Sequence, residues 1–543
     1  MKASVPSLGL FLWWLVVVYV GFTLYGEHHP DEIMQISAFS LQKMGILAAE
    51  DMPWEFHEQI RPWFQPSVYY ALLRPLVRVW GYVHLPMERL TLLVQVTLVS
   101  LAILVYRPIL AARDHRARSV SFYRWGLLSI GCMWFVPSML VRHSSEAFST
   151  LFLALSLGVW YRLAHSNVTR PTGVGLLAGL LAGLAFLSRF QVGIFVAGFW
   201  LTWVAALLRR DTTLNASESS QGGASRSAEW LRRATWTFAL GVATSLIVGF
   251  LLDWWGYGTP VISPWRYFYQ NIVLDVASEH GRSPWHAYIV WAIAYSVNPL
   301  IWFWLLRASW RSWNDPWYRS LSVGLVAFLG VHMMISHKEA RFLFPMILPA
   351  ALLLRHMFER DVYAEFKLRR WLFAPAYMRA VVVLNLAALL AFSLFFNVRD
   401  RRRFELALWK LPKDAVVFTH NDVFGFVDDS FDRQFLPRKK AYSTHFRKPT
   451  HIRLIYTKRQ HLQSACQEEA SGFVLLTGGG SSSGNVPSVN QSYETVSAFP
   501  PSWMDPDWRW WSVMRYKLVR CEHFLNALER RGNRFDARWR EPG

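Results

Sequence analysis

Long apolar runs separated by arginine-rich loops constrain the fold of this chain more than any other feature. Because a helix of roughly 20 apolar residues spans a bilayer, about eleven of these runs predict membrane helices. They lie near residues 8–25, 90–106, 125–141, 147–161, 174–187, 192–208, 234–252, 287–306, 321–335, 342–354 and 380–396. Hydrophobic residues make up 53% of the chain and charged residues 17%, which favours a polytopic α-helical membrane protein over a soluble one.

The distribution of positive charge predicts which loops are cytoplasmic. The net charge is +20, and many of the basic residues lie in one set of short loops. They are Arg107, Arg113, Arg116, Arg118 and Arg124, then Arg209, Arg210, Arg232 and Arg233, then Arg307 and Arg311, then Arg355, Arg360, Lys367, Arg369 and Arg370. Because basic loops stay in the cytoplasm, the first outer loop (26–89) and the tail after residue 397 should face the lumen or periplasm. This pattern explains the charge without a nucleic-acid partner, and we expect none.

Composition divides the chain into a membrane domain, 1–397, and a tail, 398–543. Short apolar runs at 415–418, 453–456 and 472–476 predict buried strands in the tail. We therefore expect a small C-terminal α/β domain outside the membrane. Cys466 and Cys521 lie in this tail and would be able to pair in an oxidising compartment. No cysteine spacing predicts a zinc site.

Three connecting segments of the membrane domain have patterns of their own. Segments 33–47 and 67–80 carry apolar residues at helical spacing and are interpreted as helices that lie flat on the membrane surface. Between them, the Trp-rich segment 53–66 is interpreted as a turn-rich connector. Segment 212–227 is rich in Ser and Gly and predicts a flexible cytoplasmic loop.

Two carboxylates follow the first apolar run at once, in the stretch Glu27-His28-His29-Pro30-Asp31-Glu32. Pro30 ends the helix, which leaves Asp31 and Glu32 at the membrane surface. A carboxylate there is partly removed from water, and its acidity can then suit a catalytic base. From the residues alone, a solvated pair just beyond a helix end is the commoner arrangement and remains the alternative.

A second polar cluster, residues 336–342, lies between two apolar runs. Ionisable groups at this depth are costly unless they pair or bind something. On a helical turn, Lys338 and Arg341 would share a face, and with His337 they would suit a phosphate. An anchoring turn at the interface is the alternative. Further polar groups are expected on the same side of the membrane, at 142–146, 188–191, 253–258 and 280–286.

Several of these motifs resemble the GPI and Alg-type mannosyltransferases, which form glycosyltransferase family 22 of the GT-C fold. The resemblance is carried by His29-Pro30-Asp31-Glu32 with Gln35, by Trp54-Glu55-Phe56 with Ile60-Arg61, and by His337-Lys338-Glu339-x-Arg341-Phe342. The elements at 253–258 and 284–286 are also similar. It covers about residues 8 to 400, with departures at Ile33 and at 142–146.

The resemblance implies a GT-C-like membrane enzyme that moves mannose, or another hexose, with inversion from a polyprenyl-phosphate donor to a lipid-linked glycan. The donor is usually dolichyl-phosphate mannose. The site residues that it implies are Asp31 and Glu32 for catalysis; His337, Lys338, Arg341 and Arg189 for the donor phosphate; and Glu55, Arg61, Arg142, Trp285, His286 and Glu339 for the acceptor.

The same resemblance sets expectations for cofactors, partners and location. A phosphate already on the sugar is a good leaving group, so we expect no metal ion or other cofactor. We expect a monomer whose partners are membrane lipid, the donor and the acceptor. Its site would face the lumen in a eukaryotic endoplasmic reticulum, or the periplasm in a bacterial inner membrane.

Two other classes of protein fit a polytopic chain with polar clusters. A transporter of a lipid-phosphate or sugar would carry ionisable groups near the membrane midplane, often in two matched halves. A structural subunit would use the tail to dock a partner and would tolerate replacement of Asp31. The surface position of the clusters favours the enzyme over the transporter, and the structural subunit is to be separated from the enzyme by experiment.

The charge pattern predicts the sidedness of two glycines. A cysteine reporter at Gly222 should be labelled only from the cytoplasm, and one at Gly484 only from the opposite side. Labelling of both from one side would contradict the predicted topology, on which the shared side of the polar clusters depends.

Overall fold

The computed structural model describes residues 5–23, 31–47, 49, 52–80, 84–111, 133–165, 170–217, 222–296, 300–311, 313–359, 375–395, 415–419, 453–456, 462–469, 471–478, 493–498, 513–522 and 525–526. The chain forms two compact units. The first comprises Met1–Phe22, Asp31–Met44 and Glu55–Ala391, and the second comprises Thr23–Pro30, Gly45–Trp54 and Phe392–Gly543. The expected domain boundary at 397 lies outside the described residues.

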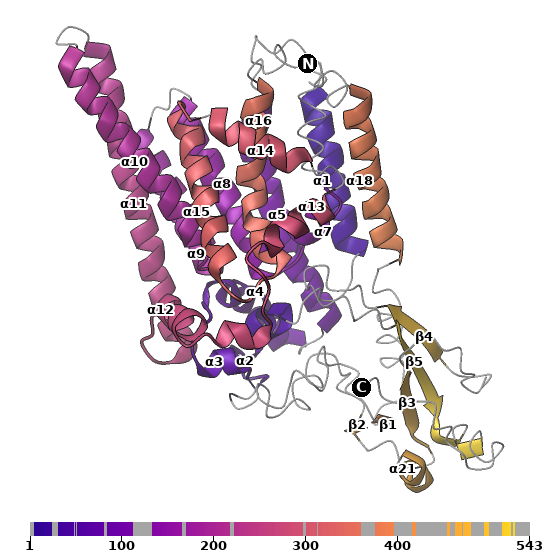
Figure 1. The fold of residues 1–543 in the computed structure, drawn as a ribbon. Coiled ribbons are helices and arrows are strands. Elements are labelled where there is room, and N and C mark those ends of the chain that lie inside the picture. The colour runs from indigo at the N-terminus through magenta and orange to yellow at the C-terminus, as the bar shows by residue number, and fades with distance from the viewer. Residues whose placement is uncertain are drawn as a thin grey trace. The chain divides into compact units, whose positions relative to one another are not determined.

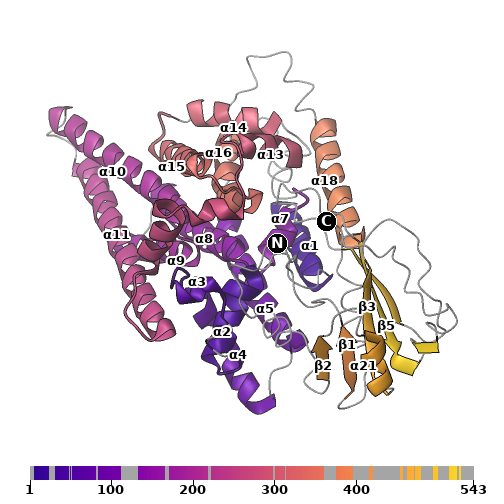
Figure 2. The same cartoon turned by 60° about the horizontal axis from the view of Figure 1, so that its bottom comes forward.

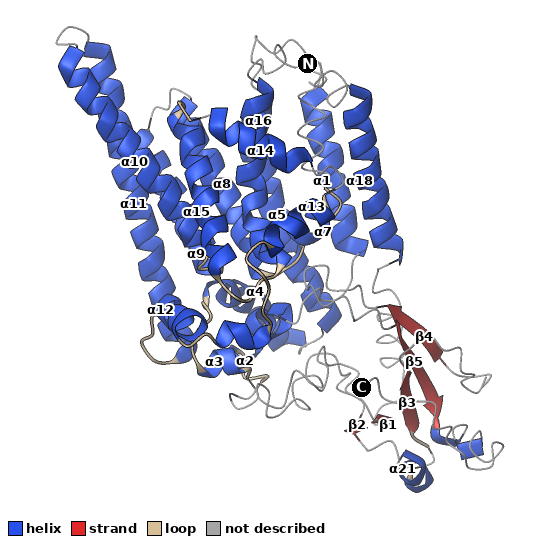
Figure 3. Ribbon diagram, viewed as in Figure 1, coloured by secondary structure: helices blue, strands red, loops and turns tan. Residues whose placement is uncertain are grey.

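Helices make up almost all of the described structure before residue 396 (Figures 1 and 3). They are α1 (Val5–Thr23), η1 (Glu32–Ser37), α2 (Ala38–Lys43), α3 (Trp54–His57), α4 (Phe64–Trp80), α5 (His84–Ala111), α7 (Val136–Leu140), α8 (Ser145–His165), α9 (Pro171–Ser188), α10 (Val192–Ser217), α11 (Gly222–Tyr257), α12 (Ser263–Phe268), η3 (Tyr269–Val273), η4 (Val276–His280), α13 (Ala287–Tyr295), α14 (Leu300–Arg311), α15 (Pro316–Met334), η5 (Ala340–Met346), α16 (Ile347–Glu359) and α18 (Pro375–Phe395).

The prediction of a mostly helical chain with several apolar helices is confirmed. Among the described residues, three segments are long and apolar enough to cross a membrane: Pro171–Ser188, Val192–Arg209 and Leu231–Tyr257. Shorter apolar helices occupy Phe11–Phe22, Leu90–Tyr106, Ala340–Leu354 and Arg379–Leu390. The number of about eleven spans stays a prediction.

Two segments differ from their predictions. The run at 287–306 is not one helix, because α13 ends at Tyr295 and Ser296 has an extended backbone before α14 begins at Leu300. The sequence between the two helices contains Pro299, which cannot donate the backbone hydrogen bond that a continuous helix needs. The predicted loop 212–227 is mostly helical, since α10 continues to Ser217 and α11 starts at Gly222.

Small residues let the long helices pack closely. A Cβ on Gly179 of α9 would lie only 2.0 Å from the carbonyl oxygen of Phe238 on α11, and one on Gly241 of α11 would lie 2.3 Å from that of Leu176. Such backbone-to-backbone approach is typical of membrane helix pairs. Around this pair, Trp160, Phe195 and Phe328 form part of a buried core shared with α8, α10 and α15.

Large apolar side chains on α11 point away from the protein. Leu240, Ile247, Leu251 and Trp254 are between 47% and 62% exposed. Figure 1 shows α12 at one end of α11, and Figures 1 and 2 both show α2 and α3 near that end. An apolar outer surface suits contact with lipid rather than water.

The second unit contains a five-stranded sheet in the order β2-β1-β3-β5-β4. Its strands are β1 (Val416–Thr419), β2 (Arg453–Tyr456), β3 (Phe473–Gly478), β4 (Tyr493–Ala498) and β5 (Val513–Arg520), and α21 (Leu462–Glu468) precedes β3. Strand β1 is parallel to β2 and β3, whereas β5 is antiparallel to β3 and β4. The three predicted strands are confirmed. Strands β4 and β5 were not predicted, because charged residues interrupt their apolar runs.

A disulfide joins Cys466 of α21 to Cys521, which follows β5. Both cysteines are fully buried and pack with Val416 and Val474 in the small core of the sheet. The backbone N–H of Cys521 also donates to the carbonyl oxygen of Gly472, at 2.8 Å. The pairing that the sequence left open is therefore made in the structure.

The close packing of α9 against α11 can be tested by replacing glycine with alanine at two different positions of α9. Gly179→Ala should destabilise the protein by about 1–3 kcal/mol, because the added methyl group forces the helices apart. Gly173→Ala in the same helix meets nothing within 4 Å and should be neutral or stabilising. Thermal unfolding midpoints in detergent measure both. Equal midpoints for the two variants would show that the pair is not packed through Gly179.

Candidate active site

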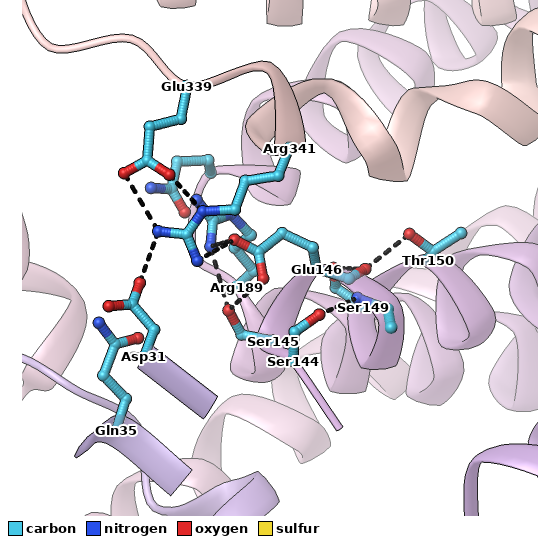
Figure 4. Close-up of polar contacts among 12 residues, drawn as sticks. Asp31, Gln35, Ser144, Ser145, Glu146, Ser149, Thr150, Arg189, Glu339 and Arg341 are labelled. Carbon is cyan, nitrogen blue, oxygen red and sulfur yellow. Dashed lines mark hydrogen bonds and ion pairs between the residues drawn. The ribbon is translucent and has the colours of Figure 1, made fainter. Parts of the chain in front are cut away.

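The side chain of Arg341 lies among three carboxylates from distant parts of the first unit (Figure 4). Its Nη2 donates to Asp31 Oδ2 at 2.7 Å and to Glu339 Oε1 at 3.1 Å. Its Nε donates to Glu339 Oε2, and its Nη1 lies 3.2 Å from Glu146 Oε1. One guanidinium thus joins the start of η1, the start of α8 and the residue before η5.

A second arginine shares Glu146. Arg189 ends α9 with an extended backbone, and its Nη1 donates to Glu146 Oε1 at 2.8 Å and to Ser145 Oγ at 3.0 Å. The helix α8 starts here because Ser144 Oγ accepts the backbone N–H of Ala147 at 3.2 Å. The guanidinium of Arg189 also lies 4.5 Å from the centre of the Phe342 ring.

Burial and charge act in opposite directions on this cluster. Burial alone would raise the pKa of the Glu146 carboxyl, but Arg189 and Arg341 outweigh burial and hold this pKa below its ordinary value. Burial alone would lower the pKa of Arg341, but Asp31, Glu339 and Glu146 hold it well above its ordinary value. Both groups are therefore charged at neutral pH.

Exposure separates Asp31 from the rest of the network. The side chain of Asp31 is 24% exposed, whereas those of Arg341 and Glu146 are 3% and 1% exposed. Neighbouring Glu32 is buried, with its Oε2 3.9 Å from His143 Nδ1. Of the two candidate catalytic carboxylates, Asp31 is thus the more exposed. Residues Glu27–Pro30, which complete the predicted cluster, lie outside the described residues.

The 337–341 segment is arranged differently from its prediction. Glu339 has an extended backbone and η5 starts only at Ala340, so Lys338 and Arg341 do not share a helical face and that expectation is wrong. Lys338 is buried, and its Nζ donates to the carbonyl oxygens of Ser283, at 3.1 Å, and Ile335. His337 Nε2 lies 3.0 Å from Glu339 Oε1.

Buried Glu55 and partly exposed Arg61 form a second polar group in the first outer loop. Arg61 Nη2 donates to Glu55 Oε1 at 2.6 Å, and Gln35 Nε2 donates to the same oxygen at 3.0 Å. Burial raises the pKa of Glu55 above its ordinary value, although Arg61 opposes the shift. Gln35 belongs to η1, the helix that Asp31 precedes, so this group adjoins the Asp31 network. The ring of Tyr267 lies 5.5 Å from the Arg61 guanidinium.

The end of α11 holds this outer loop in position. Asp253 Oδ1 accepts the backbone N–H of Trp63 at 2.8 Å, and Tyr257 OH donates to the carbonyl oxygen of Arg61 at 2.7 Å. Gly256 is required because a Cβ there would lie 2.1 Å from the Trp63 ring. The motif at 253–258 is therefore structural: it fixes the loop that carries Glu55 and Arg61.

Three of the expected acceptor residues remain: Trp285, His286 and Arg142. Trp285 and His286 are exposed and face each other with ring centres 5.4 Å apart. Arg142 is buried just before α8. Glu146 belongs to the predicted polar stretch at 142–146 but had no predicted role of its own. Its position was informative, because a carboxylate directly at the start of an apolar run requires a buried cation as partner.

Comparison with known proteins identifies the family. Residues 9–434 match the model of the Alg9-like mannosyltransferase family, Glyco_transf_22, which is most of the chain. The fold and the family together define a multi-pass membrane protein. The chain belongs to the Alg9-like mannosyltransferase family, as the motifs around Asp31 and Arg341 predicted.

Individual relatives are distant. The chain is 23% identical over 397 residues to GPI mannosyltransferase 3 of Trypanosoma brucei brucei. This alignment covers 66% of this chain and 65% of that protein. It is 24% identical over 360 residues to GPI mannosyltransferase 3 of Gibberella zeae, covering 62% of this chain and 56% of that one. The two matches thus span 65% and 56% of the relatives' length, less than two thirds in each case.

Among solved structures, ArnT from Cupriavidus metallidurans bound to undecaprenyl phosphate is similar at a TM-score of 0.49 and 11% identity. The alignment covers 95% of this chain and 98% of that one. Its structure in the apo state is similar at the same score, with 12% identity.

The anchoring of the outer loop gives a test at Tyr257. Tyr257→Phe removes the hydroxyl that bonds to the backbone of Arg61, and it should cost about 1–2 kcal/mol of stability. Tyr269→Phe is the matched control, since Tyr269 is 42% exposed. Thermal unfolding of the purified variants measures the difference. A Tyr257→Phe protein as stable as the control would mean that this contact does not hold the loop.

Proposed function

We propose that the chain is an inverting mannosyltransferase that takes its sugar from a polyprenyl-phosphate donor, such as dolichyl-phosphate mannose. The acceptor is a lipid-linked glycan of the GPI type. One observation carries the proposal: an accessible carboxylate, Asp31, lies 2.7 Å from a buried guanidinium in a chain of the Alg9-like family. The similarity to proteins named GPI mannosyltransferase 3 supports the choice of acceptor.

Asp31 acts as the general base in a single displacement. It accepts the proton of the acceptor hydroxyl while that oxygen attacks the anomeric carbon, and the bond from that carbon to the lipid phosphate breaks. Its exposure supports this role, whereas buried Glu32 orients the start of η1. No metal ion is needed, because the departing group is already a phosphate.

Cations around the 337–341 segment stabilise the charge that develops on the leaving phosphate. A phosphate oxygen replaces Asp31 at Nη2 of Arg341, because Asp31 is the most exposed of the three carboxylates around that guanidinium. This exchange releases Asp31 toward the acceptor at the moment the donor binds. Arg189 and Lys338 add to the positive field around the same group, and His337 can donate a hydrogen bond to it.

The acceptor lies along the first outer loop in this proposal. Glu55 and Arg61 contact its sugar or phosphate groups, with Arg142, Glu339, Trp285 and His286 as further contacts. The site faces the lumen of the endoplasmic reticulum or the bacterial periplasm. The Cys466–Cys521 disulfide supports an oxidising compartment for the tail, which the loop charges predict to lie on the same side of the membrane as the site.

The direct test is a transfer assay with purified protein, polyprenyl-phosphate mannose and a mannosylated lipid acceptor. The proposal requires a product one mannose larger, with inverted configuration at the anomeric carbon. A transporter would instead move the labelled lipid across vesicle membranes without forming product. Flux without transfer would overturn the enzyme assignment.

The role of Asp31 can be separated from donor binding. Asp31→Asn keeps the size of the side chain but removes the proton acceptor, so transfer should fall by about a hundredfold to ten-thousandfold. Donor binding should survive, because the lipid phosphate is held by cations. Single-turnover transfer and donor binding to detergent-purified protein measure the two effects. Transfer at the normal rate would exclude Asp31 as the base.

A further inference from the structure

Two buried arginines, Arg189 and Arg341, contact the same carboxylate oxygen of Glu146. The proposed reaction does not yet explain this arrangement. Glu146 Oε1 lies 2.8 Å from Arg189 Nη1 and 3.2 Å from Arg341 Nη1. Glu146 is fully buried, and its carboxylate contacts Arg189, Arg341 and the hydroxyl of Ser145. Its carboxylate therefore acts on the two arginines and not on the reacting atoms.

Without this carboxylate the two guanidiniums would repel each other at short range. Both lie close to the same aromatic ring, with Arg189 4.5 Å and Arg341 5.4 Å from the centre of Phe342. Two like charges this near each other in a buried site are stable only with a counter-ion between them. Glu146 supplies that counter-ion, and its low pKa keeps it charged.

Glu146 is itself held rigidly. Ser145 Oγ donates to its Oε2 at 3.3 Å, and the hydroxyls of Ser149 and Thr150 donate to its backbone carbonyl oxygen at 3.0 and 2.6 Å (Figure 4). The first turn of α8 thus holds the backbone of Glu146, and Ser145 holds its carboxylate. In contrast, the Nε of Arg189 is buried and has no hydrogen-bond partner within the described part of the chain. That guanidinium keeps a donor available for a further acceptor.

We infer that Glu146 is a positioning residue that holds Arg189 and Arg341 together as a two-arginine site for the phosphate of the lipid donor. The inference rests on the proposed function for the identity of the ligand. Two guanidiniums fixed side by side match the several oxygens of one phosphate, which a single arginine bound to carboxylates does not. The shared carboxylate fixes their spacing before the donor arrives.

The test compares the affinity for polyprenyl-phosphate mannose among variants of full-length protein in detergent. Glu146→Gln should weaken donor binding by about tenfold or more, because the arginines separate. The KM for the acceptor should not change. A residue that only supports folding would lower the active fraction and leave the donor Kd of the folded protein unchanged.

Three further variants complete the test. Glu229→Gln removes the carboxylate of an exposed Glu–Arg pair on α11 and should bind donor normally. Glu146→Asp keeps the charge but is shorter by one carbon, so its donor Kd should lie between those of wild type and Glu146→Gln. The double variant Glu146→Gln/Arg189→Gln should recover the thermal stability lost in Glu146→Gln, since no arginine is then left without its counter-ion.

The outcomes are distinct. Wild-type donor affinity in folded Glu146→Gln would overturn the inference, and so would wild-type affinity in Glu146→Asp if the glutamine variant fails to fold. Failure of the wild-type protein itself to bind polyprenyl-phosphate mannose would overturn the proposed function instead. The double variant would still report whether Glu146 and Arg189 form one ion pair.

Discussion

The described site depends on one buried guanidinium. Arg341 is 3% exposed, and removing it would leave Asp31, Glu339 and Glu146 as neighbouring carboxylates without their shared cation. A buried charge is tolerated only when groups of opposite charge surround it. Burial of Arg341 therefore depends on the three carboxylates, and burial of the carboxylates depends on Arg341. The network holds the start of η1 against the start of α8 and the segment before η5. Its most exposed member, Asp31, is the group that the proposed reaction uses.

Anchoring of the outer loop is a separate structural task, carried out by α11. The helix ends in Asp253, Gly256 and Tyr257, each of which contacts residues 61–63 by a hydrogen bond or close packing. Lys43 Nζ also donates to the carbonyl oxygen of Gly256 at 3.2 Å. An outer loop tied to the end of a long helix can hold Glu55 and Arg61 in a fixed geometry. This division assigns chemistry to the Arg341 network and rigidity to α11.

Much of the fold could be predicted from apolar runs, because a helix in lipid must satisfy its own backbone and hide its polar groups. The polar clusters were visible for the same reason, as ionisable residues beside apolar segments. The pairing of Asp31 with Arg341 could not be predicted from the sequence, because 310 residues separate them and only the tertiary structure brings them together. Lys338 was assigned to the wrong face because a helical turn was assumed where Glu339 is extended. Glu146 was passed over because its two cations lie in other segments.

The central claim is that Asp31 and Arg341 act as one unit in sugar transfer. A double-mutant cycle on kcat/KM tests it most directly, with Asp31→Asn, Arg341→Lys and the pair. The lysine keeps the charge but loses the fork that contacts Asp31 and Glu339 at once. If the two residues form a unit, the double variant should be only slightly slower than the slower single variant, as for other catalytic groups that act together. If the fold-loss in kcat/KM of the double variant equals the product of the two single fold-losses, as expected for independent sites, Asp31 and Arg341 do not act as one unit.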